Sequence, residues 1–217
     1  MSEHFYDPEA GDLRLPPHSE LLNQVAAYIP LEAIPTPEIQ QDIDQMFRVA
    51  YGRQGGESHP TLVGLAGPQI GISKRIVLIG ITDITGGEQP VLQEFINPVI
   101  LAASEETEEG REGCFSTGNV TGIVERAQWI ILQGYNRFAE LLQLQLFGLP
   151  ARVGQHELDH LDGIRIPDRI DDPVKLHWVE EHMYGDYRQS WRVWPLLCPP
   201  EVWAAMRAGL PFEAPEA

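Results

Sequence analysis

Apolar residues recur at helical spacing between residues 36 and 51. The segment follows Thr36–Pro37, and a proline at the first helical position after a threonine favours the start of a helix. Its apolar positions are three or four residues apart: Ile39, Ile43, Met46, Phe47, Ala50 and Tyr51. Gly52 comes next, so the pattern predicts a helix that ends there. The preceding residues, 1–35, show no such period and are expected to form an irregular arm.

Three further helices are predicted nearer the C-terminus. Pro150 opens a stretch with helical periodicity that ends at Asp162–Gly163, a residue pair typical of helix ends. Asp172–Pro173 is a second start signal of the same kind. The last 32 residues, 186–217, are rich in Trp and Pro and carry one short helical piece that ends near Gly209. We expect its tryptophans either to cover the core or to form a dimer contact.

The middle of the chain has strand patterns. Four segments have them: 75–81, 91–100 (interrupted by Asn97–Pro98), 128–132 and 141–146. In the last of these, leucines at alternate positions are separated by glutamines, which is typical of a strand with one buried face. A helix, then strands, then helices predicts an α+β fold rather than a parallel α/β one.

Length and charge narrow the classes of protein further. The chain has 217 residues, enough for one domain with a sizeable core. Its 15 Lys and Arg against 32 Asp and Glu give a net charge of −17, so we expect no nucleic-acid partner. No apolar run approaches the ~20 residues that span a bilayer, and we expect no membrane partner. The acidic N-terminus lacks a basic and an apolar targeting region, which favours the cytoplasm.

The strongest chemical signal is the pentad His156–His160, which reads His-Glu-Leu-Asp-His. Residues i and i+4 of a helix share one face, so both imidazoles can bind one metal ion. Glu157 then lies beside the site and can act as a general base toward water. A chance match and a structural pair of histidines are the alternatives.

Catalytic metal sites usually have three protein ligands, so a third must come from elsewhere. Cys114 stands between glycines and offers a thiolate; its alternative is a buried free cysteine that packs as a small apolar residue. Cys198, beside two prolines, fits that second description better. One disulfide between the two is also possible from their number alone.

Three segments in order resemble the signature motifs of peptide deformylases. They are Leu65–Gln69 (LAGPQ), Glu112–Ser116 (EGCFS) and Gln155–His160 (QHELDH). The resemblance covers roughly residues 20–185. It implies antiparallel β-sheets around a central helix that carries the histidine motif. We therefore expect a catalytic domain over 1–185, with the N-terminal arm, and a C-terminal extension over 186–217.

The resemblance also implies a role for each matching residue. The metal ligands are Cys114, His156 and His160, with Fe²⁺ as the native ion and Zn²⁺, Ni²⁺ or Co²⁺ as substitutes. Glu157 is the acid and base of the reaction, and the oxyanion donors are the Gln69 side chain and the Phe115 amide. The residues implied in peptide binding are Gly64, Leu65, Gly113 and Phe115. The implied reaction removes the formyl group from formylmethionyl peptides of newly made proteins and releases formate.

Several positions depart from the family's pattern. Leu62 replaces a usual glycine, and Phe115 replaces a usual leucine after the cysteine. Thr121 stands where many relatives have an arginine that faces the substrate. These departures affect the substrate pocket rather than the catalytic atoms, so a deformylase-like enzyme for another N-formyl or small N-acyl substrate is the main alternative. A zinc endopeptidase and a non-catalytic binding protein are weaker ones.

The remaining features are expected to be structural. From residue 168 to the end there are five Lys and Arg against nine Asp and Glu, which does not support ribosome docking through a basic tail; the oligomeric state stays open. The acidic run 105–109 is expected in a solvated loop, and Arg126 in an ion pair. We expect His177 and His182 at the surface or the edge of the core, and His59 in a loop near the first motif.

Overall fold

A computed structural model describes residues 14–54, 57–58, 61–81 and 90–216. Its largest sheet has the strand order β3-β4-β5-β8-β9, and every neighbouring pair is antiparallel. These strands span Gly64–Ala66, Ile76–Gly80, Leu92–Ala103, Trp129–Tyr135 and Leu141–Phe147, respectively. The sheet is therefore a mostly sequential meander, with β3 at one edge and β9 at the other.

A second sheet stands on the other side of the molecule. Its order is β10-β7-β6, again antiparallel, with β10 at Leu176–Trp178, β7 at Val120–Ala127 and β6 at Thr107–Gly113. A short hairpin joins β1 (Arg53–Gln54) to β2 (Glu57–Ser58). Because β3 and β6 each pair on one side only, both large sheets present a free edge.

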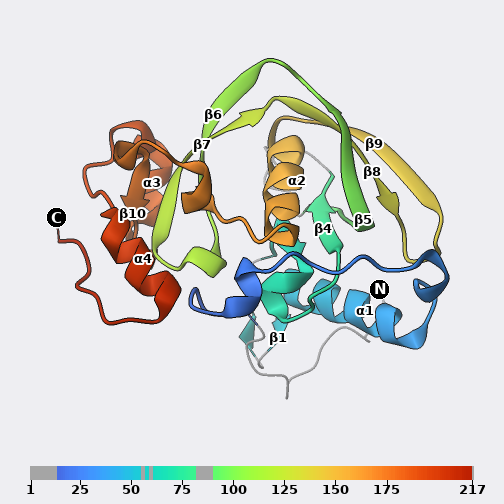
Figure 1. Ribbon diagram of the computed structural model, residues 1–217. Coiled ribbons are helices and arrows are strands. Elements are labelled where there is room, and N and C mark those ends of the chain that lie inside the picture. The colour runs from blue at the N-terminus through green and yellow to red at the C-terminus, as the bar shows by residue number, and fades with distance from the viewer. Residues whose placement is uncertain (1–13, 55–56, 59–60, 82–89, 217) are drawn as a thin grey trace.

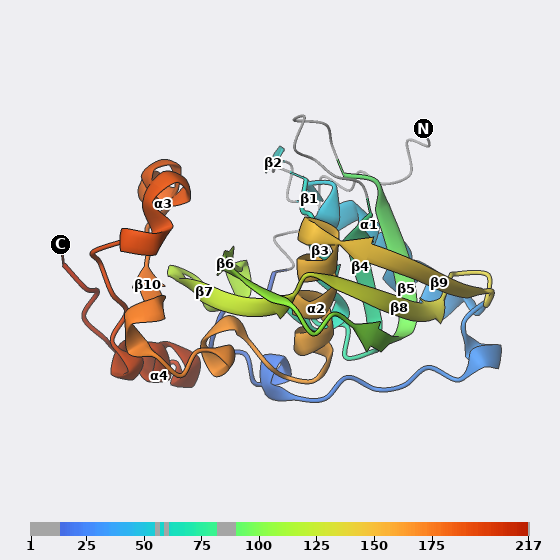
Figure 2. The ribbon, with the colours of Figure 1, turned by 90° about the horizontal axis from the view of Figure 1, so that it is seen from above.

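Helix α2 (Gly148–Leu161) stands between the two sheets (Figure 1). Helix α1 (Pro37–Ala50) packs beside β3 and β4, and α3 (Tyr184–Ser190) and α4 (Pro200–Ala208) lie on the far side of the three-stranded sheet (Figure 2). Within the described ranges, the 3₁₀ helices are Glu20–Asn23, Leu31–Ala33, Gly67–Ile70, Phe115–Thr117, Ile166–Arg169, Pro173–Lys175, Glu181–Met183 and Trp191–Val193. The predicted α+β fold, with antiparallel sheets around a central helix, is confirmed.

The apolar pattern explains where the core forms. The alternating residues of β4 and β5 bury both faces of the sheet, one against α1 and the other against α2. On the α2 side, Val77, Ile79 and Phe95 pack against Ala151 and Leu161 of the helix. Burial of such side chains contributes about 1.5–3 kcal/mol each, so α2 is held firmly along one face. The opposite face of α2 is left for polar groups.

Several predicted elements differ from those observed. The acidic run 105–109 is exposed as expected, but only its first two residues lie in a loop: residues from Thr107 onward form β6, because backbone pairing with β7 leaves the exposed side chains free to stay charged. The strand predicted over 91–100 runs without interruption from Leu92 to Ala103, since Asn97 takes a φ of 51° and shifts the register instead of ending the strand. The strand β7 was not predicted from the pattern.

The start signal at Asp172–Pro173 produces only a single 3₁₀ turn, because β10 follows immediately and pairs with β7. The predicted helix there is wrong. The prediction for His177 is also wrong: this residue is 2% exposed and bonds through Nδ1 to the hydroxyl group of Tyr187, 3.0 Å away. His182 is exposed as expected. His59 lies outside the described residues.

The C-terminal residues pack against the three-stranded sheet. Val120, Leu176 and Trp178 of the sheet form one apolar cluster with Leu196, Cys198, Val202 and Trp203. The Trp194 indole donates a hydrogen bond to the carbonyl of Trp178, so these tryptophans cover the core within the chain. The expected domain boundary after residue 185 falls inside α3. Helix α4 ends before Gly209, which has a φ of 66°, as its sequence predicts.

The N-terminal arm runs along the molecule toward α1 and crosses the C-terminal end of α2 (Figure 1). The amide of Ala26 donates to the carbonyl of Leu161 at the end of α2. The Arg165 guanidinium reaches back to the arm through the Pro17 carbonyl and Asn23 Oδ1, and it lies 4.7 Å from the centre of the Trp203 ring. One buried arginine therefore connects the arm, the end of α2 and helix α4.

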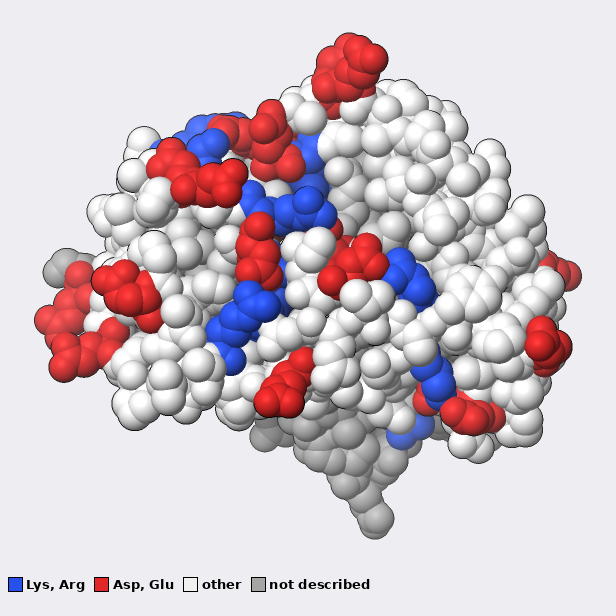
Figure 3. Space-filling view, in the orientation of Figure 1, with Lys and Arg blue, Asp and Glu red and all other residues white. Residues whose placement is uncertain are grey.

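Charged side chains are mixed on the face that Figure 3 shows, where Lys and Arg stand beside Asp and Glu over the half that holds β6, β7 and the C-terminal helices. The half that holds β8 and β9 is largely uncharged on this face. Within the described part of the chain, every helix is too short or too polar to cross a membrane.

Candidate active site

Helix α2 carries His156 and His160 on the face opposite its apolar contacts. Their Nε2 atoms lie 3.2 Å apart, as the i and i+4 spacing predicts. Burial lowers the pKa of His160 well below its ordinary value. The His160 imidazole is therefore neutral, which is the form that binds a metal.

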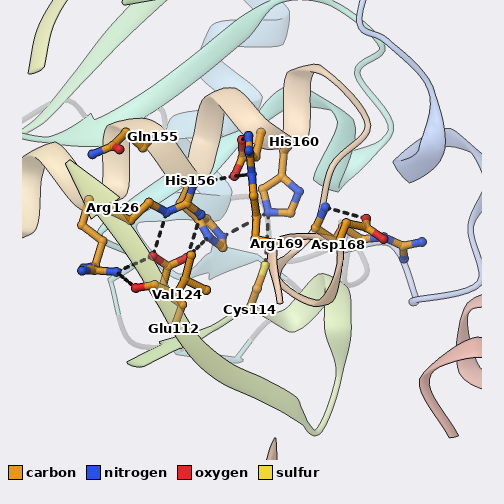
Figure 4. Close-up of polar contacts among 12 residues, drawn as sticks. Glu112, Cys114, Val124, Arg126, Gln155, His156, His160, Asp168 and Arg169 are labelled. Atoms are coloured by element: carbon orange, nitrogen blue, oxygen red, sulfur yellow. Dashed lines mark hydrogen bonds and ion pairs between the residues drawn. The ribbon is translucent and has the colours of Figure 1, made fainter. Parts of the chain in front are cut away.

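Cys114 comes to the same point from the end of β6. Its Sγ lies 3.4 Å from Nε2 of His160, and the ligand atoms of Cys114, His156 and His160 all lie within 4.8 Å of one another (Figure 4). One thiol and two imidazoles therefore converge there. Such a set of sulfur and nitrogen donors fits a tetrahedral divalent metal ion with one open position.

Glu112 fixes the orientation of the first histidine. Its Oε2 lies 3.0 Å from Nδ1 of His156, which leaves Nε2 of that ring turned toward Cys114 and His160. Burial alone would raise the pKa of Glu112, but hydrogen bonds from Arg126 and His156 hold it well below its ordinary value. Glu112 therefore stays charged, and its carboxylate fixes which nitrogen of His156 is free.

Arg126 links the Glu112 carboxylate to the Asp159 carboxylate of α2. Its guanidinium bonds both oxygens of Glu112, at 3.0 and 2.9 Å, and Oδ2 of Asp159 at 2.6 Å. Arg152 binds Glu112 from the other side, and Arg169 binds Asp159. The prediction of an ion pair for Arg126 is confirmed. The roles of Glu112 and Asp159 were missed, although each lies one or two residues from a predicted ligand.

Glu157 is buried beside the convergent ligand atoms. Burial raises the pKa of Glu157 to about 7, and the opposing charge of His156 lowers it only in part. Its Oε2 has no hydrogen-bond partner among the described residues. The neighbouring Gly64 has no room for a side chain, because a Cβ atom there would clash with the Glu157 carboxylate and with Val153. Glycine thus lets β3 pass close to this carboxylate.

Gln69 points its amide group into the site. Its Oε1 accepts a hydrogen bond from the Ala66 amide at 2.7 Å, which fixes the direction of the side chain. Its Nε2 then lies 3.1 Å from Sγ of Cys114 and 3.2 Å from Oγ of Ser116. The amide group is therefore a positioned donor at the edge of the thiol and histidine cluster.

Phe115 begins the 3₁₀ helix that follows Cys114, so its N–H group has no partner within that helix. Its ring packs against the apolar cluster of α1 and β4, and the Arg14 guanidinium lies 5.7 Å from the ring centre. The N-terminal arm also binds Gln69, since the Leu15 amide donates to the Gln69 carbonyl. The arm thus contacts both predicted oxyanion donors.

The remaining predicted residues lie on the two free sheet edges. Gly64 and Leu65 belong to β3, and Gly113 ends β6. The Leu65 side chain is fully buried, so only its backbone can contact a peptide. Thr121 is fully buried too, behind Gly113. The Thr121 side chain is therefore closed to a bound peptide here.

The fold and the site together define a class of protein: an α+β metal-dependent hydrolase with a His-Glu-x-x-His helix and a cysteine as third candidate ligand. Comparison with known proteins makes the class specific. The sequence profile of the Polypeptide deformylase family matches residues 15–175. Peptide deformylase 1 of Bordetella pertussis is 38% identical over 162 residues, which are 73% of this chain and 87% of that protein. The peptide deformylase of Desulfitobacterium hafniense is 40% identical over 151 residues, 70% of this chain and 89% of the relative.

Solved structures agree with this assignment. The class I type b peptide deformylase of Acinetobacter baumannii, bound to Met-Ala-Ser, superposes with a TM-score of 0.65 and 28% identity and covers 76% of this chain and 100% of its own. The peptide deformylase of Synechococcus elongatus, in complex with actinonin, superposes with a TM-score of 0.63 and 29% identity. The match covers 77% of this chain and 84% of that one. The chain therefore belongs to the polypeptide deformylase family, the metal-dependent hydrolases that remove the N-terminal formyl group from formylmethionyl peptides of newly made proteins and release formate.

Proposed function

We propose that Cys114, His156 and His160 hold the single divalent metal ion of this deformylase, Fe²⁺ natively, with Zn²⁺, Ni²⁺ or Co²⁺ as substitutes. The observation that carries the proposal is the convergence of one thiol and two imidazole nitrogens within 4.8 Å beside a buried carboxylate. When bound, the ion supplies Lewis-acid chemistry that lowers the pKa of water. The Glu112 carboxylate keeps His156 in the tautomer that can bind it.

Glu157 is the proton carrier in this proposal. It takes a proton from the attacking water and later gives a proton to the amine that leaves the formyl carbon. Proton transfer is most efficient when the pKa lies near the working pH, and burial raises the pKa of Glu157 to about 7. The oxygen of Glu157 without a protein partner is available for such a transfer.

Gln69 and Phe115 stabilise the negative charge that develops on the formyl oxygen. The Gln69 amide group is held by its bond from Ala66, and the Phe115 N–H has no helical partner. Donors that are oriented before the reaction need no reorganisation as the charge forms. Removal of one such donor from an enzyme typically costs about 10²–10³-fold in turnover.

The peptide would lie between the free edges of β3 and β6. An extended peptide can add to such an edge through backbone hydrogen bonds, and here the backbones of Gly64, Leu65, Gly113 and Phe115 are the available partners. The Phe115 ring forms part of the wall. The relatives described above are peptide deformylases, so they give no support to the alternative acyl substrate. Because newly made chains are produced in the cytoplasm, the proposed reaction takes place there.

The test measures formate release from formyl-Met-Ala-Ser by anaerobically purified protein, with metal content determined on the same sample. We expect turnover with about one metal ion per chain, and a Cys114→Ala variant that loses most of its metal. Tightly held metal in Cys114→Ala would show that the third ligand lies elsewhere. Absence of formate release from metal-loaded protein would reject the substrate but not the metal site.

A further inference from the structure

The C-terminal part of the chain reaches the site through Tyr184. This residue begins α3 and lies beyond residues 15–175, the part that matches the family. Its hydroxyl oxygen lies 3.5 Å from the point that a Cβ atom on Gly113 would occupy. Gly113 directly precedes Cys114 on the free edge of β6. The Tyr184 hydroxyl therefore covers this face of β6, next to the three candidate metal ligands.

Helical spacing brings two further residues to the same face of α3. Tyr184, Tyr187 and Arg188 are three and four residues apart, so they share one side of the helix. Tyr187 is 1% exposed and bonds to His177 of β10, which shows that this side faces the three-stranded sheet. Figures 1 and 2 both show α3 beside this sheet.

The two tyrosines differ in their partners. The Tyr187 hydroxyl is satisfied by Nδ1 of His177. The Tyr184 hydroxyl has no hydrogen-bond partner within the described chain, although the residue is only partly exposed. Burial raises the pKa of Tyr184, so the hydroxyl keeps its proton at neutral pH and can donate a hydrogen bond. Its location beside Gly113 directs that donor toward a peptide on the edge of β6.

Two arginines beside Tyr184 also lack acidic partners. Arg111 lies two residues before Gly113, on the same face of β6, and Arg188 approaches it from α3. Among the described residues, no carboxylate pairs with either guanidinium. The nearest acid on that strand face, Glu109, is bound to Lys175 at 2.6 Å. Loss of water lowers the pKa of Arg111, and the positive charge of Arg188 lowers it further.

We propose that Tyr184, Arg111 and Arg188 form a subsite for a carboxylate of the peptide, located on the residues that follow formylmethionine. This proposal rests on the proposed function, because it assumes that the peptide lies along β6. Two like charges held together without a counterion repel each other, and an anionic group relieves that repulsion. Charge-assisted hydrogen bonds from guanidinium to carboxylate are among the strongest in proteins.

The charge of the whole chain makes this local arrangement informative. A protein with a net charge of −17 has many carboxylates available, and most of its other described Lys and Arg residues are ion-paired. Arg111 and Arg188, which lie near the candidate metal site, have no such partners among the described residues. Thr121 is buried behind Gly113, so the proposed subsite consists of the two arginines and Tyr184 and does not include residue 121.

The experiment compares formyl-Met-Ala-Glu amide with formyl-Met-Ala-Gln amide, which differ by one charge. We expect the native enzyme to favour the Glu peptide by about tenfold in kcat/KM, and the Arg111→Gln/Arg188→Gln variant to lose this preference. Tyr184→Phe should raise KM for the Glu peptide about fivefold and leave KM for the Gln peptide nearly unchanged, with little change in kcat for either. A parallel pair, formyl-Met-Ala-Ser as free acid and as amide, tells a C-terminal carboxylate from a side-chain one.

Arg192→Gln is the matched control. Arg192 is an exposed arginine whose side chain stacks on Trp191, so its loss also removes a positive charge from the C-terminal part but should leave the peptide preference intact. Equal kcat/KM for charged and neutral members of both peptide pairs, in the native enzyme, would overturn the subsite. So would a charge preference that survives in the double arginine variant, or one that Arg192→Gln abolishes.

A direct binding measurement separates this proposal from the proposed function. If no formyl peptide is turned over, the proposed function fails, and calorimetry with Met-Ala-Glu amide and Met-Ala-Gln amide still tests the subsite. About tenfold tighter binding of the Glu peptide, lost in the double variant, would support it. Equal affinities would overturn it whatever the outcome for turnover.

Discussion

The two sides of the histidine pair differ in how their polar groups are satisfied. Behind His156, the carboxylates of Glu112 and Asp159 share Arg126 and are each bound by a second arginine. On the open side, Glu157 has an oxygen without a partner among the described residues, and burial raises its pKa to about 7. Both sides are buried, so burial alone does not explain the difference.

An unpaired buried polar group costs about 1–3 kcal/mol, which a fold tolerates only where something else offsets it. The paired side holds the ligand residues in one geometry. The unpaired side leaves acceptors and donors free to meet water, metal and substrate. The same contrast recurs in α3, where Tyr187 is bonded to His177 and the Tyr184 hydroxyl, beside Gly113, has no partner in the part of the chain that the structure describes.

The largest effect should come from neutralising the carboxylate on the open side. Glu157→Gln keeps the size of the side chain but removes its ability to take a proton. We expect formate release from formyl-Met-Ala-Ser to fall about 10³-fold, since proton transfer by a positioned group contributes about 10²–10⁴-fold. Metal content should remain near one ion per chain, because Glu157 is not among the three convergent ligand residues. Turnover close to that of the native enzyme would show that another group moves the proton.

On the paired side, the expected effect is on stability. Arg126→Ala would leave Glu112 and Asp159 with fewer counterions in a buried site, and removal of one partner from a buried ion pair costs about 3–5 kcal/mol. Urea unfolding, monitored with the same metal loading in each sample, measures the change in the free energy of unfolding.

Lys175→Ala is the control for this prediction. Lys175 forms an ion pair with Glu109 of similar length, 2.6 Å, but at the surface, where water screens the interaction. Its loss should reduce the free energy of unfolding far less than the loss of Arg126. Equal effects of the two variants would mean that the buried shell does not stabilise the site.

The sequence predicts the parts of the fold that depend on local pattern. Helices α1 and α2 follow from apolar spacing and from prolines near their starts, and β9 follows from its alternating leucines. Strand β6 could not be predicted in this way, because its residues are mostly charged and the strand exists only through pairing with β7. The helix expected after Asp172 fails for the same reason: pairing of β10 with β7 overrides a local start signal.

The residues of the candidate site differ in the same way: some could be predicted from a local pattern, and others depend on how the chain folds. His156 and His160 are recognisable from their spacing on one helix, and Cys114 from its thiol between glycines, whereas Gln69 joins them only through the resemblance to a family. Arg111 and Tyr184 carry no local signal, since their positions depend on which strands and helices the fold brings together. Glu112 had a local signal, because it stands two residues before the candidate ligand Cys114 at the end of a strand and therefore on the same face.

A third prediction concerns the packing of the C-terminal residues. Trp203 is 7% exposed and packs with Val120, Leu176 and the Arg165 guanidinium, so Trp203→Ala should lower the free energy of unfolding by about 3 kcal/mol. Trp191 is more exposed and stacks on Arg192, so Trp191→Ala should have a much smaller effect. Equal losses in urea unfolding would mean that α4 is not held against the sheet in solution.

The smallest expected effect distinguishes the two cysteines. Cys198 is 1% exposed, and burial raises the pKa of its thiol to about 11, so only about one molecule in a thousand carries its thiolate at pH 8. Cys114 is partly exposed at the open side of the site. After metal removal, a thiol reagent at pH 8 should modify one cysteine per folded chain quickly, and Cys114→Ala should abolish that reaction. Added Zn²⁺ should protect the same thiol, because metal binding uses its sulfur. Rapid modification of Cys198 in the folded chain would contradict its burial in an apolar cluster. A second reaction that appears only when the protein unfolds would agree with that burial and with a reactive thiol at Cys114.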